Sequence, residues 1–119
     1  MSNWYDKEGK LLIGDDIEVG SPEWVKGMQK VEELLSNREY KIIKQEYTPG
    51  KEYWVSTVWL GLDHSFTGGK PLIFETMVFD GERHNNRGSD YAQKRYSTEE
   101  EALRGHAKLL DKFTKKENK

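Results

Sequence analysis

The stretch that decides the fold runs from Glu52 to Phe79. It reads EYWVSTVWL over Glu52–Leu60 and LIFETMVF over Leu72–Phe79, with a glycine-rich loop between the two segments. Both segments are dense in aromatic and β-branched residues, which favour central strands. Each segment also places apolar residues on both faces of the expected strand. We therefore expect either helices on opposite faces of the sheet or a partner on one face, for which a homodimer is the simplest choice.

Further strands are expected on both sides of this pair. Tyr40–Tyr47 (YKIIKQEY) is rich in β-forming residues, and the turn Thr48-Pro49-Gly50-Lys51 joins it to the first strand. The pair Asp80-Gly81 ends the second strand, and Tyr91–Tyr96 predicts a fourth, more exposed strand. The pattern predicts an antiparallel sheet of three to four strands.

A first helix precedes the sheet in sequence. Ser21 is a good N-cap, Pro22 suits the first helical position, and the helix should end near Asn37. Apolar residues recur at helical spacing along it and form one stripe. The stripe consists of Trp24, Val25, Met28, Val31, Leu34 and Leu35.

A second helix follows the sheet. Ser97 and Glu100 have the S-x-x-E spacing of a capping box. The helix should fray after Phe113, so that 115–119 form a disordered tail. Its apolar face consists of Ala102, Leu103, His106, Leu109, Leu110 and Phe113.

The N-terminal segment Trp4–Ile13 predicts a short hairpin, with Asp6 starting the turn and Gly9 taking a positive φ. The order is then hairpin, helix, antiparallel strands and helix, which defines an α+β fold with two amphipathic helices. A chain of 119 residues fits one domain, 1–119.

The composition excludes several classes of protein. The chain has no cysteine, which excludes disulfide frameworks, thiolate metal sites and cysteine nucleophiles. No apolar run approaches the roughly 20 residues of a membrane span, and the first residues carry no secretion signal. We therefore expect a cytoplasmic protein without a membrane partner or a cofactor. The formal net charge of −2 gives no general attraction to nucleic acid.

Several segments together resemble a known family. They are WLGLDHSF followed by PLIFETMVF, the Tyr5-Asp6-x-x-Gly9 opening, and RYSTEEEALRGH at Arg95–His106. Their order and spacing are similar to those of an uncharacterised family of small bacteriophage, prophage and actinobacterial proteins. The resemblance covers a little under half of the chain, and the 14–50 region and the basic 82–94 loop depart from it. It implies a phage or prophage accessory protein acting in the cytoplasm of a bacterial host, and it assigns no catalytic residue.

The candidate catalytic or metal-binding residues are Asp63, His64, Glu75 and His106. They are the set able to form an oxygen and nitrogen metal site or an acid/base centre. No two of them have a diagnostic spacing such as H-E-x-x-H, and the chain has no P-loop, nucleophile elbow or dinucleotide fingerprint. A small metal-dependent or acid/base enzyme is therefore an alternative function with a weak signal.

The same residues have structural interpretations. Asp63 and His64 can form an Asx-type turn with an exposed histidine, in the loop that Gly68-Gly69 closes. Glu75 interrupts an apolar strand, so it points into the interior, faces solvent or pairs with a lysine of a neighbouring strand.

His106 falls on the apolar stripe of the second helix, so it should be a core histidine with a hydrogen-bonding partner. Glu75, Ser56 and Thr57 are the candidates for that partner. Glycine inside a helix costs about 1 kcal/mol relative to alanine, so the neighbouring Gly105 indicates a close approach of helix and sheet.

A basic segment defines a second alternative, a nucleic-acid-binding module that uses the 83–95 loop. Arg83, Arg87, Lys94 and Arg95 can neutralise phosphates, and Tyr91 can stack on a base. A solvated hairpin loop is the structural interpretation, and the negative net charge disfavours binding to duplexes.

The leading expectation is a binding protein without catalysis, which docks on a host protein or captures a small ligand, for example in counter-defence. It rests on the two-sided apolar sheet, on the abundance of tryptophan and tyrosine, and on the missing catalytic motif. The expected binding residues are Trp54, Trp59, Phe66, Arg83, Arg87, Tyr91 and Arg95.

Overall fold

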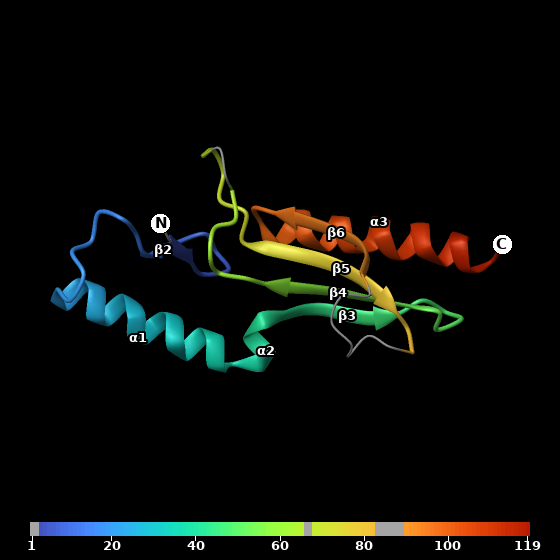
Figure 1. The fold of residues 1–119 in the computed structure, drawn as a ribbon, viewed down its shortest axis with the longest axis horizontal. Coiled ribbons are helices and arrows are strands. Elements are labelled where there is room, and N and C mark those ends of the chain that lie inside the picture. Colours follow the sequence, from blue (N-terminus) through green and yellow to red (C-terminus); the bar gives the residue numbers. More distant parts are fainter. Residues whose placement is uncertain (1–2, 66–67, 83–89) are drawn as a thin grey trace.

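The computed structural model describes residues 3–65, 68–82 and 90–119 (Figure 1). In chain order the elements are β1 (Trp4–Tyr5), β2 (Leu11–Ile13), α1 (Pro22–Ser36), α2 (Arg38–Lys41), β3 (Ile42–Tyr47), β4 (Tyr53–Trp59), β5 (Phe74–Asp80), β6 (Asp90–Tyr96) and α3 (Glu99–Glu117). Strands β1 and β2 form a hairpin, and the other strands form a four-stranded antiparallel sheet in the order β3-β4-β5-β6. The predicted α+β fold is confirmed.

Helix α3 covers one face of the sheet (Figure 1). Val55 of β4 lies opposite Val78 of β5, and both pack against Phe113 of α3. Thr57 and Thr76 form the next pair on the same face and are fully buried. The main core therefore lies between α3 and the two central strands.

Helix α1 packs mainly against the hairpin and α2, as Figure 1 shows, and only its last turn reaches the core at the end of the sheet, through Leu34. A Cβ at Gly27 would lie 2.5 Å from the carbonyl oxygen of Leu12, so only glycine allows this close approach to the hairpin. This packing disagrees with the first of the two alternatives drawn from the sequence, helices on opposite faces of the sheet, while the second, a partner on one face, stays a prediction. Within the described residues no helix covers the sheet face opposite α3.

The two ends of α1 agree with the sequence prediction, but the segment that follows this helix does not. Ser21 Oγ accepts a hydrogen bond from the amide of Trp24, and α1 ends at Asn37 as predicted. The Asn37 side chain then caps the short helix α2, so β3 begins at Ile42 and not at Tyr40. This frees Tyr40 to pack edge-on against Trp59, with ring centroids 5.1 Å apart.

Helix α3 differs from the prediction at both ends. Its capping box is formed by Thr98 and Glu101, one residue later than the expected Ser97 and Glu100. It continues through Glu117, so the expected disordered tail is wrong for 115–117. The Glu117 carboxylate accepts hydrogen bonds from the turn between β3 and β4, which fixes the last turn of the helix.

Two residues of the predicted apolar stripes are not in the core. Val25 of α1 and Leu103 of α3 are each 42% exposed. On α3, Leu103 and the exposed Ala107 lie on the flank that faces away from β6. We call this side, completed by the half-buried Leu110, the apolar flank of α3.

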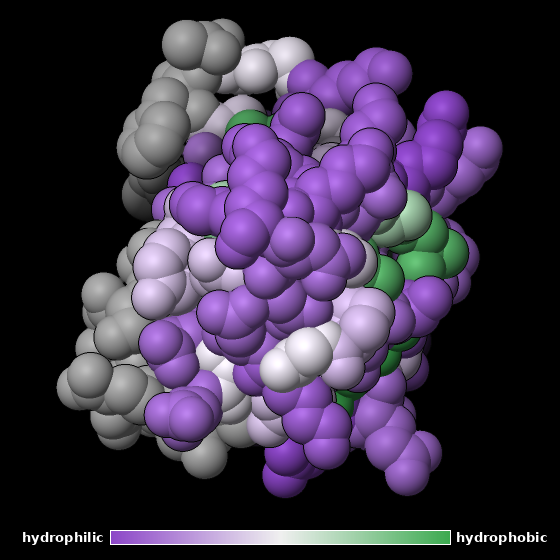
Figure 2. Space-filling model, turned by 90° about the vertical axis from the view of Figure 1, so that its right-hand side faces the viewer, coloured by the Kyte–Doolittle hydropathy of each residue, from purple (hydrophilic) through white to green (hydrophobic). Residues whose placement is uncertain are grey.

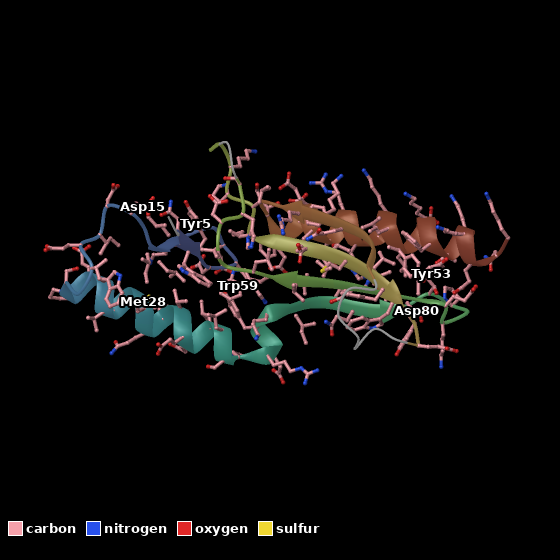
Figure 3. All side chains as sticks on the ribbon, viewed as in Figure 1. Tyr5, Asp15, Met28, Tyr53, Trp59 and Asp80 are labelled. Atoms are coloured by element: carbon pink, nitrogen blue, oxygen red, sulfur yellow. The ribbon has the colours of Figure 1, made fainter. Side chains whose placement is uncertain are left out.

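The molecule is elongated, with principal extents of 56 × 27 × 23 Å. Its Cα radius of gyration is 16.2 Å, whereas a compact domain of 100 residues has about 13 Å. The hairpin and α1 lie at one end, and the last turn of α3 lies at the other with the β3–β4 turn (Figure 1). Trp59 is buried where the hairpin meets the sheet, as Figure 3 shows, and its Nε1 donates to the Tyr5 carbonyl at 3.1 Å.

Candidate functional site

His106 belongs to a row of hydrogen bonds between α3 and the sheet. Its Nδ1 lies 2.7 Å from Thr57 Oγ1, which lies 2.6 Å from Thr76 Oγ1. On the other side of the ring, Nε2 lies 2.8 Å from Glu46 Oε2, and Lys44 Nζ approaches the same oxygen at 3.4 Å. Thr57 is therefore one of the predicted partners, and Glu46 is a partner that the sequence did not indicate.

One arrangement of protons satisfies this row. The ionised Glu46 accepts from Nε2–H of His106, so Nδ1 accepts from the Thr57 hydroxyl, whose oxygen accepts from Thr76. Burial lowers the pKa of His106, although the Glu46 carboxylate opposes this shift. Burial also disfavours the charge on Glu46, but hydrogen bonds from His106 and Lys44 outweigh it and lower the pKa of Glu46.

A hydroxyl, an imidazole and a carboxylate in this order form the constellation of a nucleophile, its base and an orienting acid. Thr57 is fully buried and His106 is only 1% exposed, so no substrate reaches the hydroxyl in this structure. A Cβ at Gly105 would overlap the Tyr96 ring, which confirms the predicted close approach of helix and sheet. The row of hydrogen bonds therefore acts as a polar part of the core that fixes α3 on β4.

Glu75 lies on the sheet face opposite His106. Side chains alternate along β5, and since Thr76 faces α3, Glu75 faces away from it. Its carboxylate accepts hydrogen bonds from Arg95 Nε at 3.0 Å and Gln93 Nε2 at 2.5 Å, both on β6. The carboxylate is thus buried and paired with an arginine, where the sequence suggested a lysine or an interior position.

Asp63 holds together the base of the loop between β4 and β5. Its Oδ1 accepts from the amides of Ser65 at 2.8 Å and Leu72 at 2.9 Å. Burial opposes ionisation, but these hydrogen bonds lower the pKa of Asp63. His64 is half-buried, and its Nδ1 lies 2.7 Å from the Leu62 carbonyl oxygen. The Asx-type turn of the structural interpretation is therefore present, but the histidine that was expected to be exposed is half-buried.

The structure does not bring the four candidate residues together. Asp63 and His64 hold a loop, Glu75 is bound on one sheet face, and His106 is buried on the other. Across residues 3–65, 68–82 and 90–119, no three histidine, aspartate or glutamate side chains are grouped to hold a metal ion.

The expected binding residues are also dispersed. Trp59 is in the core and is not the exposed anchor that the sequence suggested. Trp54 is half-buried beside Phe79, with ring centroids 5.8 Å apart, and Arg95 is bound to Glu75. Tyr91 is 52% exposed at the start of β6. Three further expected residues, Phe66, Arg83 and Arg87, lie outside the described part of the chain.

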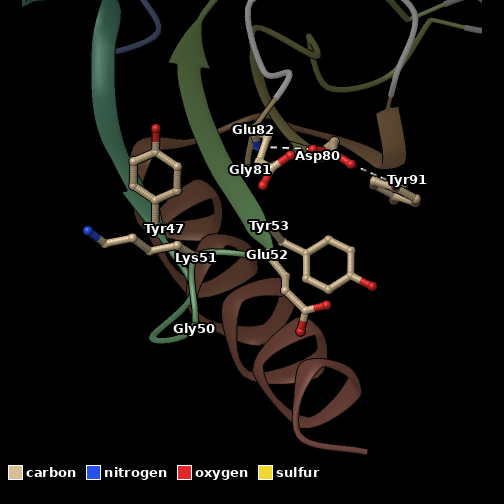
Figure 4. A pocket seen from close by; sticks show the side chains of 9 residues that line it. All are labelled: Tyr47, Gly50, Lys51, Glu52, Tyr53, Asp80, Gly81, Glu82 and Tyr91. Carbon is tan, nitrogen blue, oxygen red and sulfur yellow. Dashed lines mark hydrogen bonds between the residues drawn. The ribbon is translucent and has the colours of Figure 1, made fainter.

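A hollow of about 590 Å³ lies at the end of the molecule where the β3–β4 turn meets the end of β5 (Figure 4). Tyrosines from three strands line it, together with the carboxylates of Glu52, Asp80 and Glu82. Asp80 accepts hydrogen bonds from the Glu82 amide at 2.9 Å and the Tyr91 hydroxyl at 3.4 Å. Lys51 is the single base in its described lining, so this hollow is acidic.

A groove of opposite character runs between β6 and α3, with a volume of about 360 Å³. Tyr96 and Leu72 form the apolar part of its lining, and Glu101 is the acidic residue among the described residues that line it. The Glu101 carboxylate is held by the capping box of α3. The basic residues that line the groove are Lys94, Arg95, Arg104 and Lys108.

The bases of the groove continue along α3. At about 100° per residue, Lys112 and Lys116 lie within about 20° of Gly105, which packs on Tyr96 of β6. Figure 2 looks onto the end of the molecule that carries the last turn of α3, and this end is mostly hydrophilic. We call the row along β6 the basic flank; it consists of Lys94, Arg104, Lys108, Lys112 and Lys116.

Most cations of the basic flank have no counterion among the residues that the structure describes. Arg104 pairs with Glu100 at 3.3 Å. None of the four lysines of the flank forms an ion pair with any residue in the described part of the chain. Sequence reasoning singled out Lys94 and missed the others, because their proximity to Lys94 depends on the docking of α3 beside β6.

Among the helices that the structure describes, none has the length and apolarity needed to cross a membrane. Comparison of the chain with family models, with curated proteins and with solved structures finds no match.

Proposed function

We propose that this chain is a binding protein without catalysis, and that it binds an acidic partner through its basic flank. The observation that carries the proposal is the row of four lysines along β6 and α3 that have no carboxylate counterion within the described residues. Like charges on one surface repel each other, so a partner that supplies carboxylates gains more here than elsewhere on the molecule.

The binding free energy that we expect from these ion pairs is moderate. An exposed ion pair contributes about 0.2–1 kcal/mol, so four lysines supply about 2 kcal/mol, or about 30-fold in affinity. Larger affinity would come from the apolar lining of the groove at Leu72 and Tyr96. Electrostatic attraction would also raise the association rate at low salt.

The nature of the partner follows from the resemblance noted in the sequence. A phage or prophage accessory protein in a bacterial cytoplasm meets host proteins, and we propose that a host protein with an acidic segment is the partner. Counter-defence is one setting for such a contact. An enzyme is the weaker alternative, because the candidate residues Asp63, Glu75 and His106 lie apart.

The test is a charge reversal with a matched control. Lys94→Glu/Lys108→Glu/Lys112→Glu reverses three unpaired lysines of the basic flank, and Lys10→Glu/Lys26→Glu/Lys70→Glu reverses three exposed, unpaired lysines elsewhere. The probe is a fluorescent decaglutamate peptide at about 20 mM salt, where screening is weak.

We expect the first variant to lose at least about tenfold in affinity and the control to lose less than about threefold. Equal losses in the two variants would show that net charge alone decides binding. Absence of binding to the wild-type protein would refute the proposal.

A further inference from the structure

We propose that the acidic partner enters as an extended strand that adds to the free edge of β6, with acidic side chains at alternate positions facing α3. This inference rests on the proposed function and specifies how the partner binds.

Strand β6 is an edge of the sheet. It pairs with β5 on one side, and no described strand pairs with its other side. Its seven residues, Asp90–Tyr96, give an edge of about 23 Å at about 3.3 Å per residue. The register irregularity lies at Val78/Phe79, so the part from Ala92 to Tyr96 is regular. Between Ala92 and Tyr96 such an edge presents backbone donors and acceptors that pair with no other described strand and that an incoming strand can satisfy.

The positive charge along this edge disfavours a second copy of the chain and favours an acidic strand. Lysine on an edge strand discourages pairing with a second copy, because the same charges would face each other. Lys94 lies on the α3 side of β6, since it is opposite Thr76, which faces α3. If the carboxylates of an added strand face α3, they lie between Lys94 of β6 and the lysines of α3.

The spacing of the cations fits a strand. Arg104, Lys108, Lys112 and Lys116 recur every four residues, which at 1.5 Å per residue is about 6 Å along α3. Side chains on one face of a strand recur every two residues, at about 6.6 Å. Along the helix axis, three successive acidic side chains would therefore stay in step with three successive cations to within about 1–2 Å.

A strand also fits this place better than a nucleic-acid backbone does. Phosphates would satisfy the lysines but leave the backbone groups of the β6 edge unpaired. An acidic strand satisfies both sets of groups at once. The other face of the added strand would lie beside Gln93 and Arg95, which favours polar residues at the intervening positions.

The experiment compares peptides of one composition and charge. ETETETET carries glutamate at alternate positions, whereas EEEETTTT carries the same residues in two blocks. We expect the alternating peptide to bind at least about fivefold more tightly, because only it can align a row of carboxylates with α3. Two N-methylated forms of ETETETET, methylated on one or the other set of alternate amides, test the backbone pairing. One form should lose binding at least tenfold and the other should bind like the parent, since alternate amides of an added strand point toward and away from β6.

The peptide comparisons use wild-type protein, so their results do not depend on the folding of a variant. As a site control, Lys108→Glu/Lys112→Glu should abolish the preference for the alternating peptide, and Lys10→Glu/Lys26→Glu should keep it. Equal binding of both peptides and of both methylated forms would overturn strand addition while leaving the proposed acidic partner intact. Binding of none of the peptides would overturn the proposed function as well. Tighter binding of an oligothymidylate of equal charge would assign the flank to nucleic acid and overturn strand addition.

Discussion

At the scale of single residues, the most informative group is the buried imidazole of His106. It is neutral because burial lowers its pKa, and both of its nitrogens are satisfied by Thr57 and Glu46. A neutral imidazole joined to a charged carboxylate is stable only while the solvent does not protonate the ring. The core of this protein is therefore sensitive to acid.

The pKa of His106 gives a prediction with a definite sign. The folded pKa lies below the unfolded value of about 6.5, so below that pH the unfolded state binds more protons and stability falls as pH falls. The slope contributed by one group is at most about 1.4 kcal/mol per pH unit. Urea unfolding at pH 7.0, 6.0 and 5.5 measures it.

The His106→Leu variant should be less stable at pH 7 but should lose this slope above pH 5. Thr57→Val should be destabilised and keep the slope, because it removes the neighbour and not the titrating group. The same slope in His106→Leu as in wild type would show that another group causes the acid sensitivity.

Gly105 gives a second prediction at this scale. A Cβ there overlaps the ring of Tyr96, so Gly105→Ala should destabilise the protein by about 1–3 kcal/mol despite the better helix propensity of alanine. Denaturant unfolding of a double-mutant cycle with Tyr96→Leu isolates the overlap. In the Tyr96→Leu background the same substitution should be neutral or stabilising, and an equal cost in both backgrounds would place the effect elsewhere.

At the scale of elements, the last turn of α3 is tied to a turn far away in sequence. Glu117 accepts hydrogen bonds from Thr48 Oγ1, from the Gly50 amide at 2.7 Å and from the Glu52 amide at 3.0 Å. The Thr48 hydrogen bond is the main reason that the pKa of Glu117 is lowered. One carboxylate thus organises the β3–β4 turn and ends the helix.

Removal of this contact should loosen the turn. A chain that stops after Thr114 should show faster hydrogen exchange at the Gly50 and Glu52 amides, measured by NMR. A chain that stops after Glu117 keeps the carboxylate and should exchange like the full chain. Unchanged exchange in the shorter chain would mean that the turn is held by its own residues.

The sequence predicted individual elements well where the signal was local. The cap at Ser21, the end of α1 near Asn37, the hairpin turn and the sheet strands were found because capping and alternation depend on near neighbours. The local failures are small, since the capping box of α3 lies one residue later than predicted and the short helix α2 was missed. The larger failures are contacts between distant residues. Glu46 and His106 are 60 positions apart in the sequence, so no local pattern near either residue indicates that they form a hydrogen bond.

The placement of α1 failed for a related reason. Its apolar stripe shows that it packs on something, and the stripe does not say whether that surface is the sheet or the hairpin. Gly27 was the residue that decided this, because its missing side chain lets α1 approach Leu12. The basic flank was likewise invisible before β6 and α3 were placed side by side.

At the scale of the whole molecule, the sheet with α3 forms the larger body and the hairpin with α1 forms a smaller end. Trp59 joins them, because its ring packs on Tyr40 and its Nε1 donates to Tyr5. The smaller end buries its apolar residues against a two-stranded hairpin, which is marginal by itself. Its stability therefore depends on this junction.

Trp59→Phe tests the junction. It removes the hydrogen bond to the Tyr5 carbonyl and part of the ring, so a loss of about 1–3 kcal/mol in global stability is expected. Hydrogen exchange should rise more in β1, β2 and α1 than in β5 and α3. A uniform rise across all elements would show that the molecule opens as one unit.

The two flanks of α3 also determine how this helix folds onto the sheet. Turning the helix about its axis by a single residue, about 100°, would bring lysines of the basic flank under the strands in one direction and the apolar flank in the other. Burying even one unpaired ammonium costs several kcal/mol, so rotation that brings the basic flank under the strands is disfavoured during folding. The lysines that we propose attract an acidic strand thereby also limit how far the helix can roll on the sheet in that direction.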